Sequence, residues 1–202
     1  MKGSPVRDRQ GFFLPVSDWR LSLPRGLFAY VVQKHKATAL HYDFRLEIGG
    51  VMPSWSIPKG PTLDPTVRRL AMPTDVHDLE YRNFEGNIGE GYGAGTVMIW
   101  DEGTYTPEAE VRGGVREPLK HREEAEQAAK TGLRDGNLKF SLYGKKLSGS
   151  FALVRTRGLG RTREAWLLIK HRDEHCVAGY VANDFDFSAT TSRSLAQIAK
   201  EG

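Results

Sequence analysis

Polar and apolar residues alternate along several short stretches of the chain, a period of two that is typical of β-strands. The clearest stretch is residues 41–47, with the sequence HYDFRLE. Successive side chains of a strand point to opposite faces, so its four polar residues share one face and its three apolar residues share the other. We expect the apolar face to pack in a core. The polar face carries His41, Asp43, Arg45 and Glu47.

Seven stretches of strand-like character, separated by glycine and proline, predict strands at residues 28–33, 41–48, 54–58, 97–100, 137–143, 150–156 and 166–171. Turn-forming residues predict hairpin connections at 49–50, 101–103, 144–145 and 158–160. Most of the gaps are too short for the crossover helices that parallel strands need. The pattern therefore predicts a mainly β protein, either a barrel or a sandwich.

Helical patterns are few. Residues 117–130 contain many helix-forming residues and predict an exposed helix or helical hairpin loop with little burial, stopped by Gly132. A second short helix is predicted at 195–199, with Ser192 or Ser194 as its N-cap. Residues 1–26 are rich in Pro, Gly and charge, so we expect a loosely ordered N-terminal arm, followed by a single domain over residues 27–202.

Composition narrows the class of protein. The 202 residues are 39% hydrophobic and 10% aromatic, which is enough for a real core. There are 29 Lys and Arg against 25 Asp and Glu, and the net charge of +4 favours acidic partners. A single cysteine, Cys176, excludes a disulfide framework and a cysteine zinc cluster. Without an apolar run of about 18 residues or a signal peptide, we expect a soluble protein of the cytoplasm with no membrane association.

The polar face of residues 41–47 is the strongest candidate for chemistry. Two imidazoles and a carboxylate, from His35, His41 and Asp43, can hold a borderline divalent metal. An arginine one step further along the face, Arg45, can then grip an anion bound to that metal. The pattern predicts a metal-dependent phosphoester site. The alternative is a solvated strand edge, because a His-x-Asp pair such as His41 and Asp43 is common on such edges, and the lysines that flank His35 are typical of an exposed histidine.

Further residues fit the same hypothesis. His77 and Tyr81 can donate protons or hydrogen bonds to a phosphate or to a leaving oxygen, although their surroundings are also typical of a polar loop. Lys59 and Arg69 can contact backbone phosphates. The glycine-rich residues 89–95 match neither the Walker pattern nor the dinucleotide fingerprint and instead predict a tight turn leading into a strand.

Taken together, the motifs resemble the 3′-phosphoesterase domain of bacterial DNA ligase D. The resemblance begins with VQKH at 32–35, LHYDFRLE at 40–47, SW at 54–55 and PKGP at 58–61. It continues in the expected order with FEG at 84–86, YGAGTV at 92–97, WDEG at 100–103, LVRTR at 153–157 and WLLIKH at 166–171. It covers the chain from about residue 7 onward.

The resemblance implies a compact, closed or partly closed β-barrel of about eight strands with one or two short helices. It implies an enzyme that removes a 3′-terminal ribonucleoside from DNA and then the 3′-phosphate left behind, to give a 3′-hydroxyl. The implied metal is Mn²⁺, with His35, His41 and Asp43 as ligands, while Arg45, His77 and Tyr81 contact the scissile phosphate. Residues implied to support the site or the substrate are Gln33, Ser54, Lys59, Arg69, Asp75, Arg7 and Asp8.

The implied partners are the 3′ ends of a DNA primer-template, with separate ligase, polymerase and end-binding proteins, and the expected state is a monomer in the nucleoid of a prokaryotic cytoplasm. The chain departs from the family at Asp75, where glutamate is usual, and at Val76, where an acid is usual. Two rival hypotheses are a non-catalytic DNA-end-binding module and a non-haem iron oxygenase, because His-x-Asp with a distant histidine is also a facial-triad pattern.

Overall fold

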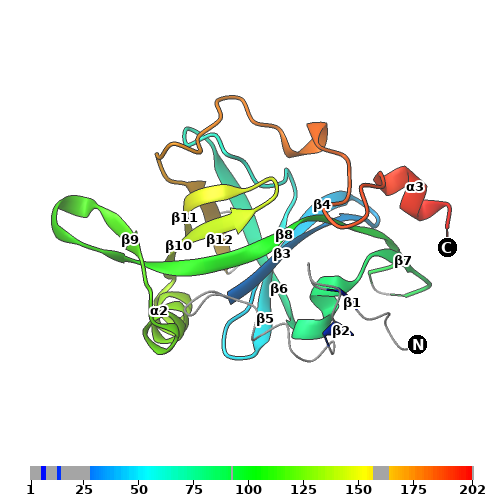
Figure 1. Ribbon diagram of the computed structural model, residues 1–202. Helices are drawn as coiled ribbons and strands as arrows, with labels where there is room; N and C mark the ends of the chain where they lie inside the picture. The colour runs from blue at the N-terminus through cyan, green and yellow to red at the C-terminus, as the bar shows by residue number, and fades with distance from the viewer. Residues whose placement is uncertain (1–5, 8–12, 15–27, 92, 157–163, 202) are drawn as a thin grey trace.

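The fold is a closed, antiparallel, eight-stranded β-barrel, as predicted (Figure 1). The computed structural model describes residues 6–7, 13–14, 28–91, 93–156 and 164–201. The barrel strands are β3 (Phe28–Lys36), β4 (Leu40–Leu46), β5 (Val51–Ile57), β6 (Arg68–Asp78), β8 (Gly95–Glu110), β10 (Asn137–Gly144), β11 (Ser148–Thr156) and β12 (Ala165–Lys170).

Strand β8 closes the barrel. The order around the wall is β10-β11-β12-β6-β5-β4-β3-β8, and β8 then pairs with β10. With 16 residues, β8 is long enough to pair with β3 along most of its length and with β10 near its far end. Every neighbouring pair is antiparallel, which agrees with the short connections seen in the sequence.

Smaller elements flank the barrel. Strands β1 (Val6–Arg7) and β2 (Phe13–Leu14) pair with each other, while β7 (Gly86–Ile88) and β9 (Arg116–Pro118) each pair with β8. The helical elements of the described residues are η1 (Leu79–Asn83), η2 (Arg112–Gly114), α2 (Arg122–Asp135), η3 (Ala182–Asp184) and α3 (Leu195–Ala199). None of these helices is long and apolar enough to cross a membrane.

The predicted hairpin turns at 49–50 and 144–145 are confirmed as the β4–β5 and β10–β11 connections. The turn predicted at 101–103 is wrong, because these residues lie inside β8 and Gly103 pairs with Tyr30. A Cβ on Gly103 would lie 2.2 Å from the carbonyl oxygen of Tyr143. This glycine therefore permits close approach of two backbones and does not mark a turn.

Strand β6 was not predicted, since residues 74–81 were interpreted either as a polar loop or as a segment that contacts the phosphate, and not as a strand. Four consecutive residues of this strand, 73–76, are exposed, so the alternation that predicts a strand is lost there. The strand is held instead by its pairing with β5 on one side and with β12 on the other. Tertiary pairing thus overrides a weak local pattern.

Helix α2 begins at Arg122 and passes through Gly132, so both predicted ends are wrong. It ends at Asp135 and is followed by the C-cap Gly136, whose φ of 77° is the left-handed conformation that favours glycine. The predicted lack of burial is also wrong, because Ala125 and Ala129 are buried where the helix meets β8 and β10. The predicted helix at 195–199 is confirmed, and Ser194 forms a capping box with Gln197.

Two apolar clusters lie on opposite faces of the same strands. The large cluster fills the barrel and includes Tyr30, Phe44 and Trp100. The small cluster lies outside the barrel and comprises Val31, Met52, Leu79 and Ile99. Leu79 belongs to η1, so this short helix covers part of the outer face of the barrel. The prediction of an arm over residues 1–26 falls mostly outside the described residues, as does the turn at 158–160.

Candidate functional site

Polar residues of four adjacent strands meet on the outer face of the barrel. The strand register places His35 opposite His41, and Gln33 opposite Asp43. It also places Arg45 opposite Ser54. Since Tyr42 and Phe44 point into the core, the alternating residues of β4 point outward, as the sequence predicted. The site is therefore a row of side chains that cross-strand pairing brings together.

His77 joins this row because of a β-bulge. Ser54 pairs with Thr74 but Met52 pairs with His77, so two steps along β5 correspond to three steps along β6. The extra residue in β6 reverses the alternation and turns His77 to the outer face, which it would not reach in a regular strand. A bulge beside a functional site re-aims a side chain in this way.

The candidate metal ligands are close together. His35, His41 and Asp43 each offer one ligand atom, and the three atoms lie within 4.8 Å of one another. His35 Nδ1 lies 3.8 Å from Asp43 Oδ2, and His41 Nε2 lies 3.5 Å from Asp43 Oδ1. His41 Nδ1 donates a hydrogen bond to the Ala39 carbonyl over 3.0 Å, which leaves the Nε2 lone pair free on the side of Asp43.

This group fits a divalent transition metal. Two imidazole nitrogens and a carboxylate oxygen form a donor set suited to Mn²⁺, Fe²⁺ or Zn²⁺. His35 Nε2 is buried without a hydrogen-bond partner, and such a buried polar atom is costly unless something else satisfies it. His35 is 7% exposed and Asp43 is 8% exposed, so the alternative of a solvated strand edge is wrong for both.

Arg45 is the centre of the site. Its guanidinium is buried and donates Nε to Gln33 Oε1 over 2.7 Å, Nη1 to Ser54 Oγ over 2.8 Å, and Nη2 to Asp43 Oδ2 over 3.0 Å. It also lies over the Tyr81 ring, 5.1 Å from the centroid. With so many partners the guanidinium has a fixed orientation, as recognition of an oxyanion requires.

Gln33 connects Arg45 to the helix η1. Its side chain is fully buried, and Nε2 donates to the carbonyls of Tyr81 and Phe84, each over 3.0 Å. Oε1 of the same side chain accepts from Arg45. The resemblance implied that Gln33 supports the site, and in the structure its side chain lies between Arg45 and η1. Phe84, whose ring stacks on Tyr81 at 5.5 Å, was not singled out as a site residue from the sequence.

Burial and neighbouring charges determine the protonation states of Asp43, His77 and Tyr81. Burial alone would raise the pKa of Asp43, but the nearby His35 imidazole and the charge of Arg45 lower it below its ordinary value, so the carboxylate is ionised. Burial and the charge of Arg45 lower the pKa of His77, so the neutral imidazole dominates near pH 7. Burial raises the pKa of Tyr81, which keeps its phenol protonated.

The neutral His77 has one nitrogen between two partners. Nδ1 lies 2.9 Å from Arg45 Nη1, which can only donate, and 2.8 Å from the Asp75 carbonyl, which can only accept. Nδ1 satisfies one of them at a time. If it accepts from Arg45, Nε2 carries the proton and is a donor. If it donates to Asp75, Nε2 presents a lone pair.

The remaining predicted residues lie further away. The Asp75 carboxylate is exposed, and the hydrogen bond between this residue and His77 uses the Asp75 backbone carbonyl. Lys59 is exposed in the loop after β5, at the same end of the sheet as His41, since Ile57 pairs with Tyr42. Arg69 shares the inward face of β6 with Ala71, and its charge acts on Asp64. The side chain of Arg7 and all of Asp8 lie outside the described residues.

Comparisons with known proteins point to one family. The family model described as the DNA ligase D 3′-phosphoesterase domain matches residues 33–155. The multifunctional non-homologous end joining protein LigD of Pseudomonas aeruginosa is 46% identical over 149 residues, which cover 73% of this chain and 16% of that protein. The LigD of Mycobacterium tuberculosis, a multifunctional non-homologous end joining DNA repair protein, is 41% identical over 130 residues, or 64% of this chain and 15% of that protein.

A third relative, the LigD of Mycolicibacterium smegmatis, is 36% identical over 146 residues, or 72% of this chain and 17% of that protein. The matches span less than a fifth of the length of each of these curated relatives. The segment of the chain that the family model matches contains the candidate metal ligands, Arg45 and the residues that accept hydrogen bonds from Arg45. The chain belongs to the DNA ligase D 3′-phosphoesterase domain family.

Proposed function

We propose that the chain is a metal-dependent DNA 3′-end-processing phosphoesterase of non-homologous end joining. It removes 3′-terminal ribonucleosides and 3′-phosphates to leave 3′-hydroxyl ends. The observation that carries this proposal is the contact between Asp43, a member of the candidate metal group, and the buried guanidinium of Arg45. Such a pair of positive centres, a metal and an arginine, suits a phosphoryl group.

His35, His41 and Asp43 hold the metal, which we propose to be Mn²⁺. When bound, Mn²⁺ supplies Lewis acidity toward a phosphoryl oxygen. The hydrogen bond between His41 and the Ala39 carbonyl fixes the orientation of that imidazole. Asp43 contributes the negative charge of the donor set and is ionised at neutral pH, because Arg45 and His35 stabilise its carboxylate.

Arg45, His77 and Tyr81 act on the phosphate. The guanidinium of Arg45 neutralises the charge that develops on a phosphoryl oxygen. Its hydrogen bonds to Gln33 and Ser54 already hold it in one orientation, so it does not need to reorganise during the reaction. The Tyr81 phenol stays protonated and donates a hydrogen bond. His77 is neutral, so it orients the phosphate or the leaving oxygen through Nε2 and does not add a full positive charge.

The chemistry is two hydrolyses. In the first, a water oxygen attacks phosphorus, the bond to O5′ of the terminal ribonucleoside breaks, and O5′ takes a proton. The products are a free ribonucleoside and a 3′-phosphate end. In the second, water attacks the same phosphorus and the bond to O3′ breaks. The products are inorganic phosphate and a 3′-hydroxyl.

The DNA partner is a primer-template end. Lys59 lies exposed at the His41 end of the sheet and is placed to contact a backbone phosphate, which adds salt-dependent affinity without reading sequence. We propose that the domain acts as a monomer, in the nucleoid of a prokaryotic cytoplasm, together with ligase, polymerase and end-binding activities.

The test uses a primer-template with a 3′-phosphate. The wild-type protein is treated with chelator, and release of inorganic phosphate is measured with and without added Mn²⁺. We expect release only with Mn²⁺, and none from His41→Ala. His175→Ala is the matched control, because His175 is exposed and lies outside the site. Activity retained in His41→Ala, or DNA binding without release in the wild type, would refute the proposal; the second result would favour a non-catalytic end-binding module.

A further inference from the structure

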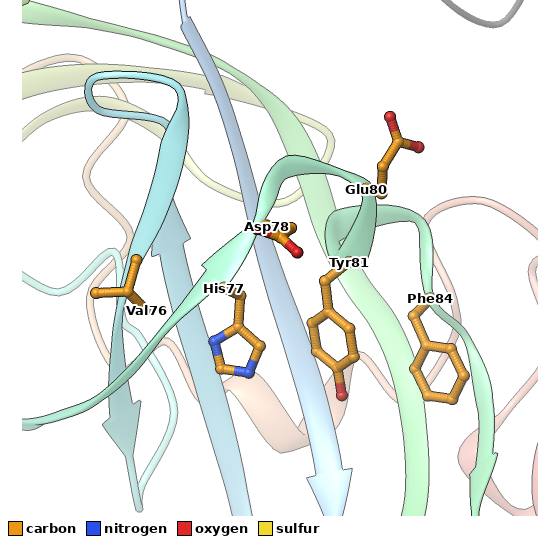
Figure 2. A pocket seen from close by; sticks show the side chains of 6 residues that line it. All are labelled: Val76, His77, Asp78, Glu80, Tyr81 and Phe84. Atoms are coloured by element: carbon orange, nitrogen blue, oxygen red, sulfur yellow. The ribbon is translucent and has the colours of Figure 1, made fainter.

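Three rings lie side by side next to Arg45. His77 and Tyr81 have ring centroids 4.7 Å apart, and Tyr81 and Phe84 have centroids 5.5 Å apart with an angle of 12° between their planes. We call His77, Tyr81 and Phe84 the ring row. Figure 2 shows the three side chains pointing in the same direction from β6, η1 and the segment that follows.

The ring row lines a surface pocket of about 520 Å³. The other residues lining the pocket are Val76, Asp78 and Glu80. This volume lies within the usual range for sites that hold a small organic group. The Arg45 guanidinium, which we propose contacts the scissile phosphate, lies 5.1 Å from the Tyr81 ring centroid. The pocket therefore begins beside the position proposed for that phosphate.

The charges of the lining residues indicate what kind of group the pocket can bind. Its lining carries two carboxylates and no lysine or arginine, and His77 is neutral near pH 7. The positive charge of Arg45 lies at the Tyr81 side of the pocket, so a phosphate placed farther along it, near Asp78 and Glu80, would meet negative charge within a screening length. Val76 is 61% exposed, so an apolar group is available at the rim. The pocket therefore favours a flat, uncharged group over a continuing sugar-phosphate chain.

We propose that this pocket binds the uncharged 3′-terminal nucleoside, the group that leaves in the first hydrolysis, with its base stacked against Phe84 at the end of the ring row. The inference rests on the proposed function and adds to it a base-binding residue that determines specificity. Stacking on one aromatic ring is worth roughly 10- to 100-fold in binding. An end that carries only a 3′-phosphate has no nucleoside to place there.

The enzymatic test compares two substrates. One primer-template ends in a ribonucleoside and the other in a 3′-phosphate, and kcat/KM is measured for both. For Phe84→Leu, we expect the ratio of ribonucleoside removal to 3′-phosphate removal to fall about 10- to 100-fold, mainly through KM. Tyr143→Leu is the matched control, since Tyr143 is 46% exposed on β10, a strand outside the site, and its ratio should equal that of the wild type. An unchanged ratio in Phe84→Leu overturns the proposal.

In a second test, the quenching produced by the wild type depends neither on turnover nor on the folding of a variant. A primer whose terminal base is 2-aminopurine loses fluorescence when that base stacks, so binding by the wild type should quench it and binding by Phe84→Leu should not. In addition, the wild type should remove a terminal ribose without a base as slowly as Phe84→Leu removes a complete ribonucleoside. Turnover without quenching refutes the base site, whereas quenching without turnover refutes the proposed catalysis and leaves the base site standing.

Discussion

Replacing Gln33 with leucine removes three buried hydrogen bonds while changing the side-chain volume little. The amide of Gln33 donates to the carbonyls of Tyr81 and Phe84 and accepts from Nε of Arg45. Leucine leaves all three of those groups buried without this partner. Because a buried polar group without a partner is costly, the loss exceeds the net worth of the hydrogen bonds themselves.

The expected loss in the free energy of unfolding can be worked out from the types of hydrogen bond that are removed. A hydrogen bond to a charged group contributes about 1.5–3 kcal/mol and a neutral one about 0.5–1.5 kcal/mol. The three bonds share one side chain and are not additive, so we expect the free energy of unfolding to fall by about 3 kcal/mol in Gln33→Leu. For a chain of this size, each kcal/mol lowers Tm by about 2–4 °C, which gives a decrease of about 6–12 °C.

The assay is thermal unfolding followed by circular dichroism, in chelator, for the wild type, Gln33→Leu and Gln127→Leu. Gln127 is exposed on α2 and makes one hydrogen bond, to Thr131, so its replacement should change Tm by less than about 2 °C. A Tm for Gln33→Leu within about 2 °C of the control would refute the role assigned to Gln33 as the link between η1 and Arg45.

Three further predictions use the same wild-type protein. Asp43→Asn removes the carboxylate of the proposed metal site, so calorimetric titration with Mn²⁺ should show affinity reduced by at least about 100-fold, and a loss under threefold would contradict the assignment. The pKa of Asp43 is lower in the folded state, so its contribution to stability is complete above the ordinary value of 3.8 and is lost as the pH falls below it. In chelator, the Tm advantage of the wild type over Asp43→Asn should therefore shrink between pH 5 and pH 2, and a constant difference would exclude this linkage. Ser194→Ala breaks the capping box of α3 and should cost about 1 kcal/mol in urea unfolding, whereas Ser192→Ala should cost less; equal costs would refute the capping role.

Much of the site was predictable because β4 alternates cleanly. Once residues 41–47 were assigned to a strand, the period of two put His41, Asp43 and Arg45 on one face. The short connection to the preceding strand then brought His35 opposite His41. The number of strands and the barrel closure were expected from the resemblance. The closure itself depends on the pairing of β8 with β10, a long-range contact that no local pattern encodes.

The residues that the sequence could not place are those whose face depends on tertiary pairing. His77 reaches the site only because of the bulge in β6, and the bulge is visible only in the register with β5. The pairing of β6 with β12 puts Arg69 on the inward face, opposite to the face that carries the candidate metal group. Phe84 was not predicted as a site residue for another reason. Its ring stacks on Tyr81, and the sequence alone does not show which aromatic rings are neighbours.

The most direct measurement is a time course with a primer-template that ends in one 3′-ribonucleotide, with and without Mn²⁺, in which the 3′ end of each product is identified by gel mobility and mass. We predict that wild-type protein with Mn²⁺ first yields a primer ending in a 3′-phosphate and then one ending in a 3′-hydroxyl, and that His41→Ala yields neither. Cleavage that is independent of Mn²⁺ and of His41, or a primer that is bound but never shortened, would contradict the assignment of this face of the barrel as a metal-dependent phosphoesterase site.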